Sequence, residues 1–149
     1  GKGFAGASSW QVWWFPWHTK AMNQNERRQL LAAPYKLRGR TTSGIDCLGV
    51  VLHVLQLRGS AALDPWRNLL HEWKSGQVAT ASAFPCDWHR CEGPLIEGDV
   101  GIFQGDHSWA AIVYQGEVWS AHPDVGVWCK QLRNFQQTPN EIWRQLLPC

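Results

Sequence analysis

The period of the hydrophobic pattern changes once along this chain of 149 residues. Up to about residue 76, apolar residues recur at helical spacing in segments that prolines and glycines separate. Later they alternate with polar residues in four short segments, 98–103, 107–114, 117–122 and 125–129, which predicts an antiparallel meander. Helices followed by a sheet predict an α+β fold, and the length predicts a single domain over residues 1–149.

Three helices are expected in the first half of the chain. Asn23 and Glu26 form a capping box that opens the first helix. The second runs from residue 46 to about 57, and the third from 64 to 76 after an Asp-Pro start signal. Residues 77–97 give no periodic signal and are predicted to be irregular.

The two ends of the chain carry further signals. Residues 1–22 form a tryptophan-rich N-terminal extension, expected either to lie over the core or to offer an aromatic platform for sugar rings or a partner. Residues 138–141, Thr-Pro-Asn-Glu, read as a capping box with proline in the first turn. They predict a C-terminal helix that carries Ile142, Trp143 and Leu146.

The charge pattern argues against two classes of partner. The formal net charge is +2, and the 14 basic and 12 acidic residues are interspersed, so no patch for nucleic acid or an anionic membrane is expected. No apolar run reaches the roughly 20 residues that span a bilayer. The amino terminus also lacks the charged and apolar regions of a signal peptide.

The chain has five cysteines, an odd number that suggests one functional thiol and up to two disulfides. The spacing allows Cys86 to pair with Cys91 and Cys129 with Cys149. Disulfides would place the protein outside the reducing cytosol. Alternatively, Cys86 and Cys91 could bind zinc together with His89, but the spacing fits no standard zinc motif and no fourth ligand is evident.

Cys47 stands where a polar, turn-forming segment gives way to an apolar helical one. Asp46 is a plausible N-cap, and Gly49 allows another backbone to approach closely. The free N–H groups and the positive dipole end of a helix favour a thiolate, so the pKa of this thiol is expected to be lowered. Cys47 is therefore the candidate nucleophile.

A two-residue turn at positions 115–116 would set the register of the following strand, with Tyr114 facing Glu117. That register places His107 and His122 on one face of the sheet, near the same end. A cysteine nucleophile needs a base that takes its proton and remains as imidazolium beside the thiolate. These two histidines are the candidates for that base.

From residue 26 to about 132 the chain resembles the NlpC-type cell-wall peptidases, which are papain-like cysteine enzymes. The motifs that carry the resemblance are Pro34-Tyr35, Gly39, Ser43-Gly44-Ile45-Asp46-Cys47-Leu48-Gly49-Val50, Gly98-Asp99-Val100-Gly101-Ile102-Phe103 and Ala110-Ala111-Ile112-Val113. The resemblance implies a papain-like fold, in which a buried helix with cysteine at its start packs on an antiparallel sheet. The run from Asp46 to Val50 is most similar to phage-tail and gene-transfer-particle members.

The family cleaves peptide stems of peptidoglycan through an acyl-enzyme on the cysteine. The resemblance therefore implies attack by Cys47, with no cofactor and no metal. The N–H of Cys47 and a neighbouring donor such as Tyr35 would stabilise the oxyanion, next to Asp46.

Two positions depart from the family pattern. Alignment of the strand puts Trp109 where the histidine base belongs and Ser120 where the residue that orients the ring belongs. His107 and His122 each lie two positions away, on the same face of the strands. Three alternatives stay open: His107 is the base, His122 is the base, or the site is inactive.

The expected function is that of a cysteine hydrolase of peptidoglycan stem peptides, acting outside the cytoplasm. It would be a phage tail or lysis component, or an injected toxin with an immunity-protein partner. One alternative is an inactive papain-like module that binds a glycan or a partner, which Trp109 in the base position favours. Another is acyl transfer or deamidation by the same thiol chemistry.

Overall fold

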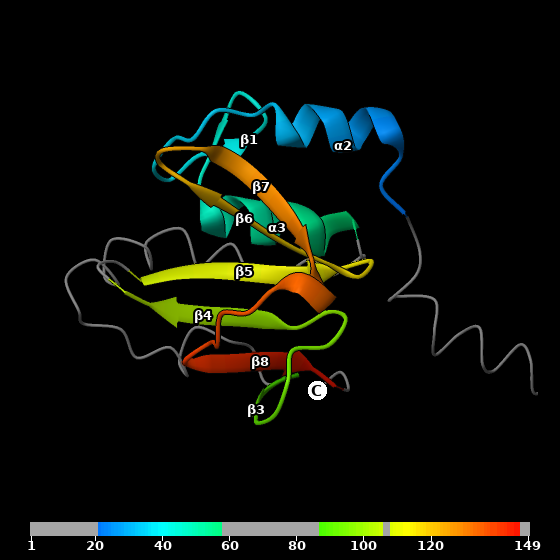
Figure 1. Cartoon of the computed structure of the whole chain (residues 1–149). Helices are drawn as coiled ribbons and strands as arrows, with labels where there is room; N and C mark the ends of the chain where they lie inside the picture. The colour runs from blue at the N-terminus through cyan, green and yellow to red at the C-terminus, as the bar shows by residue number, and fades with distance from the viewer. Residues whose placement is uncertain (1–20, 58–86, 106–107, 147–149) are drawn as a thin grey trace, which may run out of the picture.

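The computed structural model describes residues 21–57, 87–105 and 108–146. In these ranges two helices pack on a six-stranded antiparallel sheet of order β3-β8-β4-β5-β6-β7 (Figure 1). The elements are α2 (Gln24–Leu31), β1 (Arg40–Thr41), β2 (Gly44–Ile45), α3 (Cys47–Leu57), β3 (Trp88–Cys91), β4 (Val100–Gln104), β5 (Ser108–Tyr114), β6 (Glu117–His122), β7 (Gly126–Gln131), the 3₁₀ turn η3 (Leu132–Asn134) and β8 (Glu141–Gln145). The predicted α+β fold is confirmed.

Two of the three helices predicted in the first half of the chain are confirmed, and the third lies outside the described residues. The capping box at Asn23 is present, because the Asn23 side chain accepts from the Glu26 N–H at 2.8 Å and the Glu26 carboxylate accepts from the Asn23 N–H at 3.1 Å. The helix that begins at the cysteine is also confirmed. The expected helix 64–76 and the extension 1–22 lie outside the described residues, apart from positions 21 and 22.

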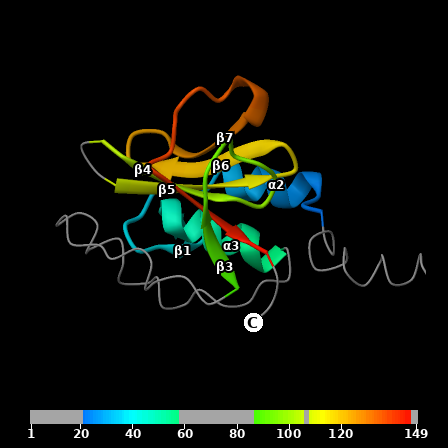
Figure 2. The ribbon, with the colours of Figure 1, turned by 90° about the horizontal axis from the view of Figure 1, so that it is seen from below.

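The sheet has an apolar cluster on each face. One consists of buried α3 residues packed against alternate residues of β5 and β6: Ala110, Ile112, Tyr114, Trp119 and Ala121. The other contains the intervening residues: Ala111, Val113 and Val118 with Phe103 of β4. Figure 2 shows α3 on one side of strands β4 to β6 and the segment that follows β7 on the other. Burial of each large aliphatic side chain contributes about 1.5 to 3 kcal/mol to this packing.

The predicted meander is present as β4 to β7. Tyr114 faces Glu117, as the turn at 115–116 predicted. Gln115 and Gly116 both have positive φ, 51° and 75°, which suits a tight hairpin turn. The Glu97 carboxylate accepts from both N–H groups of the turn, at 2.6 and 3.0 Å, and so holds its conformation.

The prediction of a C-terminal helix is wrong, because residues 141–145 form strand β8. This strand fills the place between β3 and β4, where it pairs with both. Asn140, expected in the first turn of that helix, instead accepts from the Gln104 N–H at 2.9 Å and donates its own N–H to the Ile102 carbonyl at 2.8 Å. The segment 77–97, expected to be irregular, contributes β3, the second partner of β8.

A buried ion pair fixes β8 to the start of β4. The Asp99 carboxylate is fully buried, and it accepts two hydrogen bonds of 2.7 Å from the Arg144 guanidinium. The N–H of Ile96 adds a third at 2.9 Å. Bidentate geometry and a backbone donor together satisfy a carboxylate that would be costly to bury alone.

The expected disulfides are not formed at the two described cysteines concerned, since Cys91 and Cys129 are free thiols. The sulfur of Cys129 lies 3.3 Å from a guanidinium nitrogen of Arg27 and 3.6 Å from the Glu117 carboxylate. The intended partners, Cys86 and Cys149, lie outside the described residues. Within the described ranges, no helix has the length and apolar character needed to cross a membrane.

Replacement of Arg144 should test the ion pair. Arg144→Gln leaves the buried Asp99 carboxylate without its cation, so we expect the free energy of unfolding to fall by about 3 kcal/mol in urea titrations at pH 7. Arg28→Gln, on an exposed part of α2, is the control and should change it by less than about 0.5 kcal/mol. Equal losses in the two variants would contradict a structural role for this pair.

Candidate active site

The first turn of α3 is held by the buried carboxylate of Asp46. It accepts from the Gly49 N–H at 2.8 Å, which makes Asp46 the N-cap that the sequence predicted. It also accepts from the Arg38 N–H at 2.6 Å and from the Arg40 guanidinium at 2.9 Å. These bonds fix the backbone of the residue that precedes Cys47, and so they fix the position of Cys47 at the start of the helix.

The predicted close approach at Gly49 is confirmed. A Cβ at this position would collide with the carbonyl oxygen of Gly39 and lie 2.6 Å from the Ile45 side chain. Gly39 precedes β1 and Ile45 is the last residue of β2, so Gly49 lets the β1–β2 hairpin pack directly on the first turn of α3.

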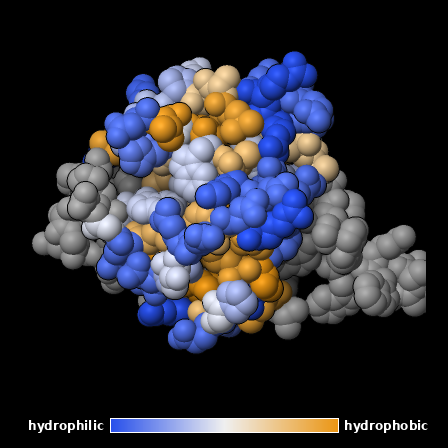
Figure 3. Space-filling view, viewed as in Figure 1, coloured by the Kyte–Doolittle hydropathy of each residue, from blue (hydrophilic) through white to orange (hydrophobic). Residues whose placement is uncertain are grey.

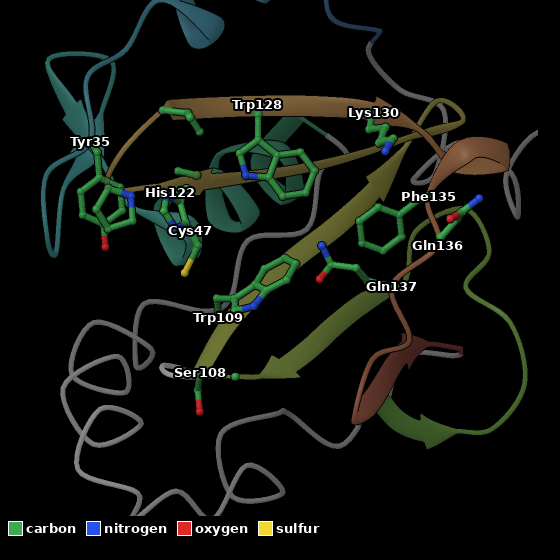
Figure 4. Close-up of a pocket in the computed structure, with 14 residues that line it drawn as sticks. Tyr35, Cys47, Ser108, Trp109, His122, Trp128, Lys130, Phe135, Gln136 and Gln137 are labelled. Carbon is green, nitrogen blue, oxygen red and sulfur yellow. The ribbon is translucent and has the colours of Figure 1, made fainter.

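Cys47 opens into a cavity of about 680 Å³. The residues that line it are Tyr35, Cys47, Gly105, Ser108, Trp109, Ala121, His122, Pro123, Val125, Trp128, Lys130, Phe135, Gln136 and Gln137. In the view of Figure 4, Cys47, Tyr35 and His122 lie at one end and Lys130, Phe135 and Gln136 at the other, with Trp109 and Trp128 between them. We call the end with Cys47, Tyr35 and His122 the thiol end, and we call the part lined by the following residues the aromatic end: Trp109, Trp128, Lys130, Phe135, Gln136 and Gln137.

The prediction of a lowered thiol pKa is wrong. Burial, with a smaller contribution from the negative charge of Asp46, raises the pKa of Cys47 to about 12. The N–H of Ala110 on β5, the N–H of Leu48 at the helix start and the charge of Arg40 lower the pKa, but their combined effect is smaller than that of burial and Asp46. In this structure the thiol is therefore protonated at neutral pH.

Tyr35 lines the same pocket near the thiol, and its backbone forms a bridge to Ile45. Its place is fixed by backbone bonds on both sides, from the Lys36 N–H to Ile45 and from the Ile45 N–H to Pro34. Burial, together with the nearby Cys47 and Asp46, raises the pKa of the Tyr35 hydroxyl to about 12. The hydroxyl stays protonated at neutral pH and can donate a hydrogen bond into the pocket.

His122 is the one described histidine that lines the pocket. Its side chain is 56% exposed, and its Nδ1 accepts from the Asp124 N–H at 3.1 Å. Among the described residues, no histidine is one of the groups that shift the pKa of the Cys47 thiol. His107, the other candidate base, lies outside the described residues.

The thiol and the predicted histidine face belong to different sides of the sheet. Cys47 packs with Ala110 and Ala121, whereas Ala111 and Val118 belong to the cluster on the opposite face, and the half-buried Trp109 packs against both clusters. The β5–β6 ladder ends at Ile112 and Trp119, and the Ser120 hydroxyl donates to the Ala110 carbonyl at 2.6 Å beyond it. The pocket therefore joins the two faces around the strand ends, and the Ser120 proton is already engaged by the backbone.

Five residues of the aromatic end were missed in the sequence: Trp128, Lys130, Phe135, Gln136 and Gln137. The register of β6 with β7 pairs Ser120 with Trp128 and Val118 with Lys130. Residues that pair across two strands share a face, so assigning the faces of β7 from those of β6 would have placed Trp128 and Lys130 beside Ser120 and Val118. The other three follow η3, where no periodic signal marks them.

The zinc alternative gains no support from the described residues, where no group of three or more His, Cys, Asp or Glu side chains could hold a metal ion. His89 is exposed on β3, and Cys91 donates to its carbonyl at 3.5 Å. Cys86 lies outside the described residues.

The thiol pKa can be measured through alkylation. The rate of iodoacetamide labelling at Cys47 is followed by peptide mass spectrometry as a function of pH. It should still be rising at pH 10, whereas an ordinary thiol, with a pKa of about 8.5, is almost fully ionised there. Asp46→Asn keeps a side-chain acceptor for the cap but removes the charge that raises the pKa. The dependence of the labelling rate on pH should then shift to lower pH. A wild-type midpoint at or below pH 8.5 would contradict this assignment.

Neither a scan against models of known protein families nor a search of the curated proteins finds a match. Among solved structures, the chain is similar to a crystal structure described as the NlpC/p60 domain of the peptidoglycan hydrolase SagA. The identity is 22%, the TM-score is 0.48, and the match covers 79% of this chain and 92% of that chain. At this level of similarity, the function has to be argued from the residues of the site.

Proposed function

We propose that the protein is a cysteine hydrolase that cleaves amide bonds in peptidoglycan stem peptides, with Cys47 as the nucleophile. One observation carries the proposal: the cysteine of the Asp-Cys-Leu-Gly-Val motif is the first residue of a buried helix, and it opens into a pocket shared with Tyr35 and His122. The order of motifs that resembles the NlpC-type peptidases supplies the substrate class.

The proposed reaction begins with attack of the Cys47 sulfur on the peptide carbonyl. The N–H of Cys47 and the hydroxyl of Tyr35 stabilise the oxyanion, the second because it remains protonated at neutral pH. The amine leaves with the proton that the thiol gave up, and water then hydrolyses the thioester. No step requires a cofactor.

The base is proposed to be His107, with His122 or Ser120 as the residue that orients its ring. His122 is less suited in its present position, because its Nδ1 accepts from Asp124 and a neutral ring then carries its proton on Nε2. A thiol with a pKa near 12 needs an imidazolium beside it to react at neutral pH. His107 would reach the thiol from the residues that precede β5.

Peptidoglycan lies outside the cytoplasm, so the proposed site of action is the periplasm or the cell wall. Delivery as a phage-tail component or as a secreted effector, the latter with an immunity-protein partner, is part of the proposal. It is supported by the run Asp46 to Val50, which resembles phage-tail and gene-transfer-particle members.

A second function is favoured by a specific observation. Trp109 lines the pocket in the position where the family has its base, and the thiol is buried with a raised pKa. An inactive papain-like module that binds peptidoglycan without cleaving it would have these features.

Incubation with purified sacculi separates the two functions. We expect the wild type to release peptides that mass spectrometry detects, and Cys47→Ala and His107→Ala to lower the release at least about 100-fold. His122→Ala should retain more activity than His107→Ala. Equal release by the wild type and Cys47→Ala would end the hydrolase proposal, and binding of sacculi without release by either would support the inactive module.

A further inference from the structure

The aromatic end is the part of the cavity that lies away from the thiol. Its walls come from β5, from β7 and from the segment between η3 and β8. The cavity of about 680 Å³ is of the size that binds a complete small ligand rather than a single amide group. The residues concerned are Trp109, Trp128, Lys130, Phe135, Gln136 and Gln137.

The rings at this end are fixed by one another. Trp109 stacks on Phe103 with centroids 4.1 Å apart and an angle of 11° between the planes. Trp128 meets Trp109 edge to face at 6.0 Å and stacks with Phe135 at 6.2 Å. Trp109, Trp128 and Phe135 are only partly buried, so they present ordered aromatic surface to the pocket at little cost in conformational entropy.

The polar groups beside these rings are mostly uncharged. Gln136 and Gln137 are exposed and offer amide donors and acceptors, and Lys130 adds one cation. None of the described lining residues is an aspartate or a glutamate. The site therefore suits a neutral ligand or one with an anionic group, and disfavours a cationic one. In Figure 3, which has the view of Figure 1, apolar residues come to the surface among hydrophilic ones.

We propose that the aromatic end is a subsite for an N-acetylated sugar ring of the glycan strand. One face of a pyranose is made of C–H groups that pack on an indole, while its hydroxyl and acetamido groups hydrogen-bond to amide side chains such as those of Gln136 and Gln137. This proposal rests on the proposed function, because that function supplies peptidoglycan as the ligand. It adds that the protein recognises stem peptides that are still attached to sugar.

The test is a binding measurement that needs no turnover. Cys47→Ala protein is titrated calorimetrically with an N-acetylglucosaminyl-N-acetylmuramyl peptide and with the same peptide lacking the disaccharide. We expect the disaccharide ligand to bind at least tenfold more tightly. Addition of Trp128→Ala should reduce that advantage to less than twofold, and addition of Gln137→Ala, at an exposed position, should reduce it severalfold. Gln29→Ala, on the exposed surface of α2, is the control and should leave it unchanged.

Equal affinity for the two ligands would overturn the subsite, as would an advantage that survives both pocket substitutions in proteins with unchanged thermal melting. Absence of binding by either ligand would also overturn it. The proposed function fails in a different way: if the wild type cleaves neither ligand while Cys47→Ala prefers the disaccharide, the subsite stands without the hydrolase. Equal cleavage of both ligands by the wild type would remove the subsite and leave the hydrolase.

Discussion

The buried carboxylate of Asp46 is the interaction on which the candidate site depends. It caps α3 through Gly49, and it binds the backbone of Arg38 and the guanidinium of Arg40, which belong to the segment that packs on the helix start. Removal of these partners would leave a carboxylate buried without compensation. The same negative charge raises the pKa of the adjacent thiol. Asp46 therefore secures the position of Cys47 while it opposes the thiolate that catalysis needs.

Reactivity at Cys47 is consequently a balance between burial and local donors. The helix start and the N–H of Ala110 favour the thiolate, but burial and Asp46 outweigh them. Among the described residues, no histidine contributes to the pKa shift of the Cys47 thiol, and the Nδ1 of His122 accepts from the Asp124 N–H. A catalytic role thus depends on an imidazolium that reaches the sulfur from the strand ends, where the pocket joins both faces of the sheet. The proposed sugar subsite would hold substrate across that junction.

Local signals predicted the parts of the structure that local interactions stabilise. Asn23 and Asp46 cap their helices, and the turn at 115–116 sets its hairpin, because the partners lie within a few residues. Strand β8 could not be predicted in this way, since its partners β3 and β4 are distant in sequence and override the capping signal at 138–141. The thiol pKa was mispredicted for a related reason: burial is a property of the assembled fold.

Covalent trapping is the direct measurement of whether Cys47 reacts. Wild-type protein is mixed with a disaccharide-linked stem peptide, quenched in acid within the first turnovers, digested and analysed by mass spectrometry. The hydrolase proposal predicts an added mass on the peptide that contains Cys47, equal to the acyl part of the cleaved substrate and absent without substrate. Accumulation of cleaved product under the same conditions with Cys47 unmodified throughout would contradict it, and so would an acyl group found only on Cys91 or Cys129.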